Sequence, residues 1–207
     1  MGSISRQWSE RPDPTGNALA LVCGFVDKVA SLWYSRSFGR RRENRGQMSV
    51  ERIARAWELL QEAYKYQMEG ELELAVDLYQ RSIDTHPTAE AYTFLGWTYH
   101  HQGKTEKAIA ECKKAIALDP DFGNPYNDIG AYLIEQGRHG EAVEWLDKAI
   151  RSKRYASYHY PHYNLGRVYM AQDQLNDARR CFQRALELAP DYTLARDALD
   201  QVRRKLM

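Results

Sequence analysis

The sequence predicts an all-α protein made of stacked helix pairs, because four series of residues recur at spacings of 33 to 36 residues. Amphipathic stripes with helical periodicity lie between these markers, as in residues 126–133 and 142–150. The four series are Gly96, Gly130 and Gly166; Ala75, Ala108, Ala142 and Ala178; Gly70, Gly103 and Gly137; and Pro87, Pro120 and Pro190, with Arg154 in the third proline slot. Several residue types that recur in phase predict about four copies of one supersecondary unit.

Each unit is predicted to contain two helices joined by a tight turn. Gly137 falls between the two stripes of the third unit, where a turn residue needs a positive φ. Gly130 and Ala142 fall where these helices would cross, and small residues there let the backbones approach closely. A proline near the end of a unit cannot continue the second helix. The predicted boundaries are 56–88, 89–122, 123–158 and 159–192 for the units, 193–206 for a polar-backed capping helix, and 49–207 for the domain.

The pattern of these markers resembles the tetratricopeptide repeat. Residues 91–120, AYTFLGWTYHHQGKTEKAIAECKKAIALDP, carry its aromatic, Leu-Gly, Tyr, turn Gly, Ala and Pro, and residues 162–190, HYNLGRVYMAQDQLNDARRCFQRALELAP, carry most of them. The resemblance implies a right-handed superhelical solenoid of about four helix-turn-helix units plus the C-terminal capping helix. The departures from the pattern are Ala63, Ser82, a longer link in residues 151–161, and Asp173 in place of a turn glycine.

Composition and charge argue against several classes of function. The 207 residues are 43% hydrophobic and carry 29 Lys and Arg against 28 Asp and Glu, a balance that gives no basis for nucleic-acid binding. Cys23, Cys112 and Cys181 have no disulfide-framework spacing and are interpreted as reduced thiols of a cytoplasmic protein. Cys112 and Cys181 fall at packing positions of second helices, so we expect core thiols.

The sequence predicts no enzyme, no cofactor and no metal site. P-loop, G-x-S-x-G, H-E-x-x-H and paired C-x-x-C patterns are missing. His100 and His101 would point about 100° apart on a helix, which is poor geometry for chelation. His159 and His162 could share a helix face but have no evident third ligand.

In the tetratricopeptide-repeat family, the first helices of the units line the concave side of the solenoid, and their inward positions form a groove. Projected onto this chain, those positions are rich in aromatic and amide side chains, which suit an extended peptide backbone and provide hot spots. The predicted groove residues, called the groove row below, are Tyr64, Gln67, Thr93, Trp97, His100, His101, Asn124, Asn127, Tyr160, Tyr163 and Arg167.

The groove row leads to the hypothesis of a non-enzymatic adaptor that binds an extended peptide or a partner helix. For Tyr64, Trp97 and Tyr163 the alternative to an exposed position is packing between repeats. The tyrosines expected in the core are Tyr99, Tyr132 and Tyr169. Co-chaperones of the family grip a C-terminal carboxylate with a Lys and an Asn on one first helix, but Leu60 and Tyr64, or Thr93 and Trp97, fill those slots here. We therefore do not expect a co-chaperone.

Residues 1–48 differ in character from the repeats. Residues 18–35 are mostly apolar with a narrow polar arc, which predicts an amphipathic helix, and residues 36–46 form a basic linker in a partly disordered extension. Eight Lys and Arg against four Asp and Glu favour contact with an anionic membrane surface or a partner. The residues assigned to that surface are Phe25, Val29, Leu32, Trp33, Arg40, Arg41 and Arg42. The alternatives are a solvated linker, docking on the repeats, self-association, and a start at Met48 with Ser49 as helix N-cap.

The third unit carries a second, narrower resemblance. Residues 126–157, YNDIGAYLIEQGRHGEAVEWLDKAIRSKRYAS, resemble the middle repeat of outer-membrane pilotins for type IV pilus assembly, including the Arg-Tyr before the next repeat. The likeness implies a membrane-associated assembly factor, pilotin-like or secretion-related, as the alternative function. Val22 stands before Cys23 where a lipoprotein cleavage box has a small residue, which argues against a lipid-anchored pilotin.

Overall fold

The computed structural model describes residues 40–207, with side chains from Met48 onward. Within this range the chain is helical, and its one β-type pairing is an isolated bridge between Phe122 and Arg154. The helices are α3 (Arg40–Glu69), α4 (Leu72–Thr85), α5 (Ala89–His101), α6 (Thr105–Leu118), α7 (Asn124–Glu135), α8 (His139–Arg151), α9 (His159–Ala171), α10 (Leu175–Leu188) and α11 (Thr193–Leu206). The predicted all-α helical repeat fold is confirmed. Contacts divide the chain after Arg55 into two compact units, which are described separately.

The described part of the first unit is the N-terminal portion of α3. This helix begins at Arg40, earlier than the start predicted near Met48. Ser49 therefore lies inside the helix and is not its N-cap, and residues 40–46, expected to be a linker, are helical. Arg, Glu and Gln have good helix propensities, which lets the helix run through this charged stretch in spite of Gly46.

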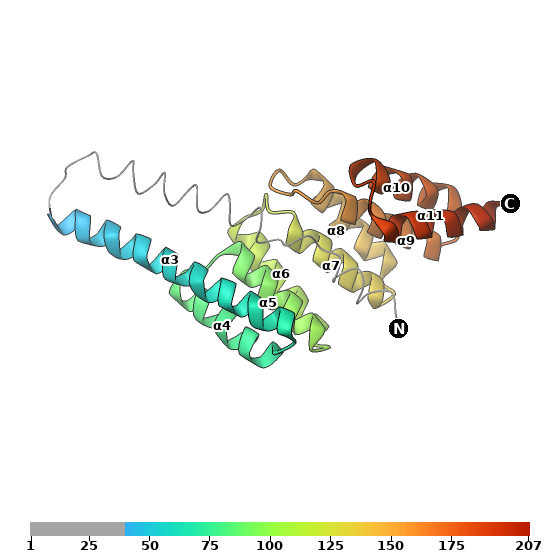
Figure 1. Ribbon diagram of the computed structural model, residues 1–207. Helices are drawn as coiled ribbons and strands as arrows, with labels where there is room; N and C mark the ends of the chain where they lie inside the picture. Colours follow the sequence, from blue (N-terminus) through green and yellow to red (C-terminus); the bar gives the residue numbers. More distant parts are fainter. Residues whose placement is uncertain (1–39) are drawn as a thin grey trace. The chain divides into compact units, whose positions relative to one another are not determined.

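The second unit, from Ala56 onward, is a succession of helix pairs (Figure 1). α5 packs against α6, α7 against α8, and α9 against α10. Each of the second helices α4, α6 and α8 also packs against the first helix of the following pair. First helices of neighbouring pairs touch as well, α5 with α7 and α7 with α9, so one face of the stack is built from first helices alone.

The turns inside the helix pairs adopt a left-handed backbone conformation. The φ angles of Gly70, Gly103 and Gly137 are +86°, +74° and +73°, which confirms the prediction for the turn glycine. Glycine reaches this region without a Cβ clash. Asp173 occupies the same place in the last pair with a φ of 58°, which a short polar side chain tolerates better than most but still at a cost.

Replacing this aspartate with glycine should stabilise the protein. Asp173→Gly removes the Cβ clash, and we expect the free energy of unfolding to rise by about 0.5–1 kcal/mol. Urea unfolding followed by circular dichroism measures the change. The reverse exchange at an equivalent turn, Gly103→Asp, should lower the free energy of unfolding by a similar amount. Destabilisation by Asp173→Gly would contradict this account of the turn.

Close approach of the paired helices explains the small residues at their crossing points. A Cβ atom added to Gly96 would lie 2.9 Å from the backbone oxygen of Ala108, which cannot move without shifting α6. At Gly130 the added atom would lie 2.6 Å from Cδ2 of Leu146. These contacts confirm the close crossing of the paired helices that was predicted from the recurring glycine and alanine.

Two buried clusters form much of the core. One joins α3, α4 and α5, and the other joins α9, α10 and α11. Tyr132 is fully buried as predicted, whereas Tyr99 and Tyr169 are half-buried. Cys112 is fully buried. Cys181 is only half-buried, unlike the predicted core thiol. Burial still raises the pKa of its thiol to about 11, so the thiol is protonated at neutral pH.

Helix α11 covers the end of the stack, as predicted for a capping helix. Its buried residues are Ala195, Leu199 and Val202, which follow one another at helical spacing. Leu206 is 40% exposed, because it lies in the final turn with only Met207 beyond it.

Candidate functional site

The first part of the groove row lies between α3 and α5. The ring of Phe94 lies 5.5 Å from that of Tyr64 and 6.4 Å from that of Trp97, measured between centroids. His101 meets Trp97 edge-on at 5.2 Å. Tyr64 is half-buried, Trp97 is 5% exposed and His101 is exposed. Phe94, which the projection onto inward positions omitted, therefore links two successive first helices.

The second part of the row joins α5 to α7 through His100. Its Nε2 lies 3.1 Å from Oε2 of Glu135, and its ring stacks on Tyr132 with centroids 4.2 Å apart. Its Nδ1 lies 3.4 Å from the hydroxyl of Thr105. His100 thus bridges neighbouring repeats by polar and ring contacts, and its orientation is fixed by groups from α6 and α7.

Buried amides form the third part of the row, between α7 and α9. Asn164 Nδ2 donates a hydrogen bond to Asn127 Oδ1 at 3.0 Å, and Arg167 Nη1 donates to Asn164 Oδ1 at 3.1 Å. Asn127 is 1% exposed and Asn164 is fully buried. The amide of Asn127 therefore pairs with its neighbour in the next repeat. Asn164 was missed as a member of the row, although its spacing of 37 residues from Asn127 is close to the repeat length.

The last part of the row is an aromatic cluster at the start of α9. The ring of Tyr192, which precedes α11, lies 5.5 Å from that of Tyr160 and 5.2 Å from that of Tyr163, both edge-on. The ring centroid of His159 lies 4.1 Å from that of Tyr160. Tyr160 and Tyr163 are 3% and 5% exposed. Edge-to-face packing of this kind stabilises the joint between the fourth repeat and the capping helix.

The remaining members of the row differ in accessibility. Thr93 is buried and donates its hydroxyl to the backbone oxygen of Ala89 at 2.7 Å. Gln67 is buried, and its Oε1 accepts a hydrogen bond from the hydroxyl of Tyr79 at 2.7 Å. The members that are not buried are exposed His101 and half-buried Tyr64, His100, Asn124 and Arg167. The row is thus a largely buried polar and aromatic surface with a few accessible side chains.

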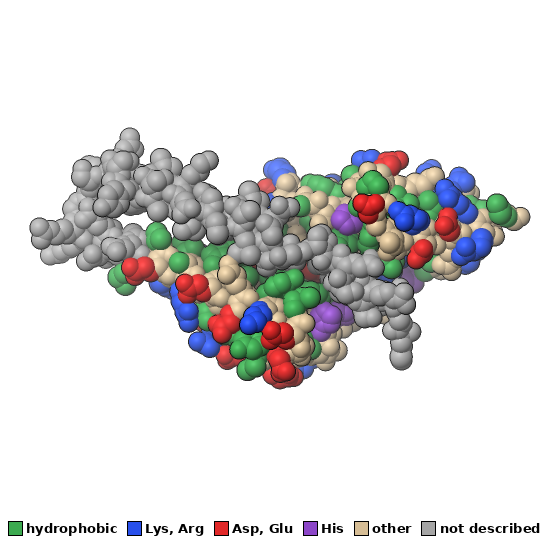
Figure 2. All heavy atoms as spheres, viewed as in Figure 1, with side chains coloured by type: hydrophobic (Ala, Val, Ile, Leu, Met, Phe, Trp, Pro, Cys, Tyr) green, Lys and Arg blue, Asp and Glu red, His purple; other side chains and the backbone are tan. Residues whose placement is uncertain are grey.

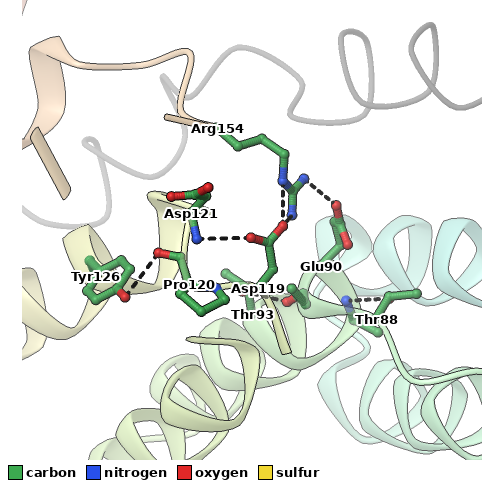
Figure 3. A network of polar contacts seen from close by, with 10 residues as sticks. Thr88, Glu90, Thr93, Asp119, Pro120, Asp121, Tyr126 and Arg154 are labelled. Atoms are coloured by element: carbon green, nitrogen blue, oxygen red, sulfur yellow. Dashed lines mark hydrogen bonds and ion pairs between the residues drawn. The ribbon is translucent and has the colours of Figure 1, made fainter. Parts of the chain in front are cut away.

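The longer link between α8 and α9 positions Arg154, which the sequence analysis treated only as a family feature. The guanidinium bonds Asp119 through Nε at 2.7 Å and Glu90 through Nη1 at 2.7 Å, and it lies 4.1 Å from the ring centroid of Phe122 (Figure 3). The backbone pairs too, because Arg154 N–H donates to Asp121 oxygen at 2.9 Å. The link therefore fastens the third repeat to the second, at the start of α5 and at the segment between α6 and α7.

The charge of Arg154 is favoured by its surroundings. Burial opposes the charged form, but the carboxylates of Glu90 and Asp119 outweigh it, so the pKa of Arg154 is raised. The side chain of Glu90 is 15% exposed, so removing the guanidinium would leave a largely buried carboxylate without this partner.

The described residues contain no cluster of three His, Cys, Asp or Glu side chains suited to a metal ion. The ring of His159 contacts the rings of Tyr160 and Tyr192. Burial, followed by the positive charge of Arg184, lowers the pKa of His162 below its usual value.

His162 should make the protein less stable in mild acid. Because its pKa is lower in the folded than in the unfolded state, the unfolded chain binds more protons just below pH 6.5. The free energy of unfolding therefore falls as the pH drops from 6.5 toward the folded pKa, and the penalty is absent above pH 7. Urea titrations from pH 7.5 to about pH 5 should show a shallower decline for His162→Gln than for the wild type. Equal declines would contradict this role for His162.

Charged side chains of both signs lie interspersed over the face shown in Figure 2. On the second helices they form short-range pairs such as Arg184 with Glu187 and Arg138 with Glu141, both at 2.7 Å.

Three stretches of the chain match family models described as tetratricopeptide repeat: residues 89–122, 111–144 and 159–192. The chain is a tetratricopeptide-repeat protein. Proteins built from this repeat mediate contacts with other proteins, and the repeat scaffold itself is typically non-catalytic. The predicted family is confirmed.

Two curated relatives illustrate the breadth of the likeness. The protein is 30% identical over 103 residues to the small glutamine-rich tetratricopeptide repeat-containing protein 2 of Mycosarcoma maydis, covering 49% of this chain and 29% of that one. It is 27% identical over 124 residues to the type IV pilus assembly protein PilF of Pseudomonas aeruginosa, covering 59% of this chain and 49% of that one. The chain thus spans at most about half the length of these relatives.

Solved structures show the same fold. The Pseudomonas aeruginosa PilF structure has a TM-score of 0.71 at 23% identity and covers 75% of this chain and 70% of that one. The first repeat domain of Spaghetti (RPAP3), solved with an HSP90 peptide, has a TM-score of 0.53 at 24% identity and covers 57% of this chain and 93% of that one. At these identities the likeness concerns the fold.

The residues assigned to a membrane or partner surface cannot be placed as a site. Phe25, Val29, Leu32 and Trp33, with the predicted helix 18–35, lie outside the described residues. The run Arg40, Arg41 and Arg42 begins α3, where only the backbone is described. Among the helices that the structure describes, none has the length and apolar character needed to cross a bilayer.

Proposed function

We propose that this tetratricopeptide-repeat protein is a non-catalytic adaptor that binds a protein partner, as an extended peptide or a helix, along the groove row. The continuity of the row carries the proposal. Tyr64 reaches Phe94 across α3 and α5, His100 reaches Glu135 across α5 and α7, and Asn127 pairs with Asn164 across α7 and α9. A partner that lies along the row would contact four successive repeats.

The chemistry of the row favours recognition of a largely apolar segment. Half-buried Tyr64 and exposed His101, whose ring meets buried Trp97 edge-on, offer ring surface to a partner at small entropic cost. The slots that hold a lysine in carboxylate-binding co-chaperones are filled by Leu60, which is 1% exposed, and by Thr93, which is 6% exposed. An adaptor without a carboxylate clamp therefore remains our prediction. A cytoplasmic location also remains a prediction.

Site-specific photo-crosslinking in cells tests the proposal. A benzophenone side chain in place of exposed His101 should capture a defined partner, and Arg167→Ala, two first helices away, should reduce the yield several-fold. The matched control places the same crosslinker at exposed Lys113 on second helix α6. Equal products from the two positions, or a His101 product indifferent to Arg167→Ala, would exclude the groove row as the binding surface.

A second candidate function is assembly of an envelope structure at a membrane. It is supported by the likeness to PilF in sequence and in fold, and by the ordered Arg154 link within the repeat that resembles pilotins. The full chain should then float with vesicles that contain anionic lipid, whereas a chain that begins at Met48 should not. Equal flotation of the two chains would remove this candidate, and light scattering of the same pair tests self-association.

A further inference from the structure

Gln67 of the groove row carries a buried hydrogen-bond donor that no described residue accepts. The side chain is 6% exposed, and its Nε2 atom is buried without a hydrogen-bond partner. Its other end is fixed, because Oε1 accepts the hydroxyl proton of Tyr79 at 2.7 Å. A buried amide donor without an acceptor is costly and rare in folded proteins, so this one calls for an explanation.

The surroundings of Gln67 fix the direction of this donor. Tyr79 is fully buried, and its ring stacks on Phe94 at 6.0 Å with an interplanar angle of 8°. Tyr64 lies one turn before Gln67 on the same face of α3 and also contacts Phe94. The amide is therefore held by an aromatic layer from α3, α4 and α5, and its bond to Tyr79 fixes the direction in which Nε2 points.

We propose that Gln67 is a recognition residue that donates a hydrogen bond to a backbone carbonyl of the bound partner, and that the partner is therefore extended where it crosses α3 and α5. The inference rests on the proposed binding function of the groove row and narrows it. The carbonyl groups inside a helix already accept hydrogen bonds from the helix itself. An extended segment presents free carbonyl groups, and these match a fixed amide donor.

Removal of the donor should separate stability from binding. Here and below, Gln67→Met is made in a Tyr79→Phe background and compared with Tyr79→Phe alone as the reference, because the buried Tyr79 hydroxyl would otherwise lose its acceptor. Gln67→Met keeps a similar volume but has no N–H group, so in that background the free protein should unfold at an equal or higher urea concentration. Binding should weaken about tenfold, because one hydrogen bond from a preorganised donor is lost. A purely structural role for Gln67 predicts the opposite pair of results, a less stable protein with a proportionate loss of binding.

Linear peptides selected from a random phage-displayed library against the full chain provide the probe. Peptides whose binding falls at least several-fold with Trp97→Phe and with His101→Ala are taken as groove-row binders. In one of them, each backbone amide is replaced in turn by an ester, whose carbonyl is a poorer acceptor. One ester should weaken binding to the Tyr79→Phe reference about tenfold yet have no effect on binding to Gln67→Met, because both changes remove the same hydrogen bond.

The outcomes distinguish the two levels of the proposal. If selected peptides respond to neither Trp97→Phe nor His101→Ala, or if no peptide is selected, the groove row is not a peptide-binding surface and both proposals fail. If peptides respond to those changes but bind Gln67→Met as tightly as the Tyr79→Phe reference, the adaptor function stands and the assignment of Gln67 is wrong. Bound peptides that are helical by circular dichroism also overturn the extended conformation.

Discussion

Gly166→Ala is expected to lower the free energy of unfolding by about 2–3 kcal/mol, although it adds only one methyl group. The new Cβ atom would lie 2.4 to 2.8 Å from three ring atoms of Phe182. Phe182 is fully buried and contacts Tyr163, so its ring has no free space to enter. The helices α9 and α10 must separate, and close-packed interiors resist such shifts. Chemical denaturation measured by tryptophan fluorescence gives the change.

A glycine in the preceding repeat provides the control. Gly140 lies in α8, and a Cβ atom added there would meet nothing within 4 Å. Gly140→Ala should therefore stabilise the protein by about 0.5–1 kcal/mol through helix propensity alone. The double variant Gly166→Ala with Phe182→Leu should be less unstable than the sum of the two single changes, because the smaller side chain admits the methyl group. Additive losses would show that contact with Phe182 is not the cause.

Arg154→Ala is expected to lower the free energy of unfolding by about 1–2 kcal/mol. The side chain is 47% exposed, so solvent screening limits each ion pair, and the estimate combines Glu90, Asp119 and the ring of Phe122. Amide hydrogen exchange should also rise in the link of residues 152–158, since the bond between Arg154 Nε and Asp119 fastens it to the second repeat.

The control for Arg154 is an arginine with a simpler pair. Among the contacts resolved for Arg203, its Nη1 lies 3.1 Å from Oδ1 of Asp200, three residues earlier in α11. Both side chains of this pair are exposed. Arg203→Ala should change the free energy of unfolding by less than about 0.5 kcal/mol, as expected for an exposed ion pair. If Arg154→Ala is equally mild and leaves the exchange rates of the link unchanged, Arg154 does not fasten the repeats.

Sequence reasoning predicted the local features of the repeats well. The turn position of Gly137 and the crossing at Gly130 follow from local rules, because a positive φ and a close contact each restrict the residue type directly. A start at Met48 with Ser49 as N-cap was one of the alternatives left open, and α3 instead runs through Ser49 from Arg40, since the preceding residues also favour a helix. A cap motif indicates a helix start only when the residues before it disfavour helix.

The groove row was predicted only as a set of helix positions. The projection placed Trp97 and His101 in one row, where their rings meet, but it left open whether inward aromatic side chains face a partner or pack between repeats. Asn127 and Tyr163 instead lie buried against Asn164 and Tyr192. The position of a residue on a helix follows from periodicity, whereas its accessibility depends on which side chains the neighbouring repeats bring to it.

By itself, the sequence determined the repeat length, the helix pairs and the family, and it led to a binding surface as the functional hypothesis. These properties depend on residue spacing along one chain. Only the tertiary structure decided that Arg154 bonds Glu90, 64 residues away, and that the amide of Gln67 is held by Tyr79 with an unpaired donor. The physical reason is that hydrogen bonds and burial depend on distances between atoms of different helices, which periodicity does not specify.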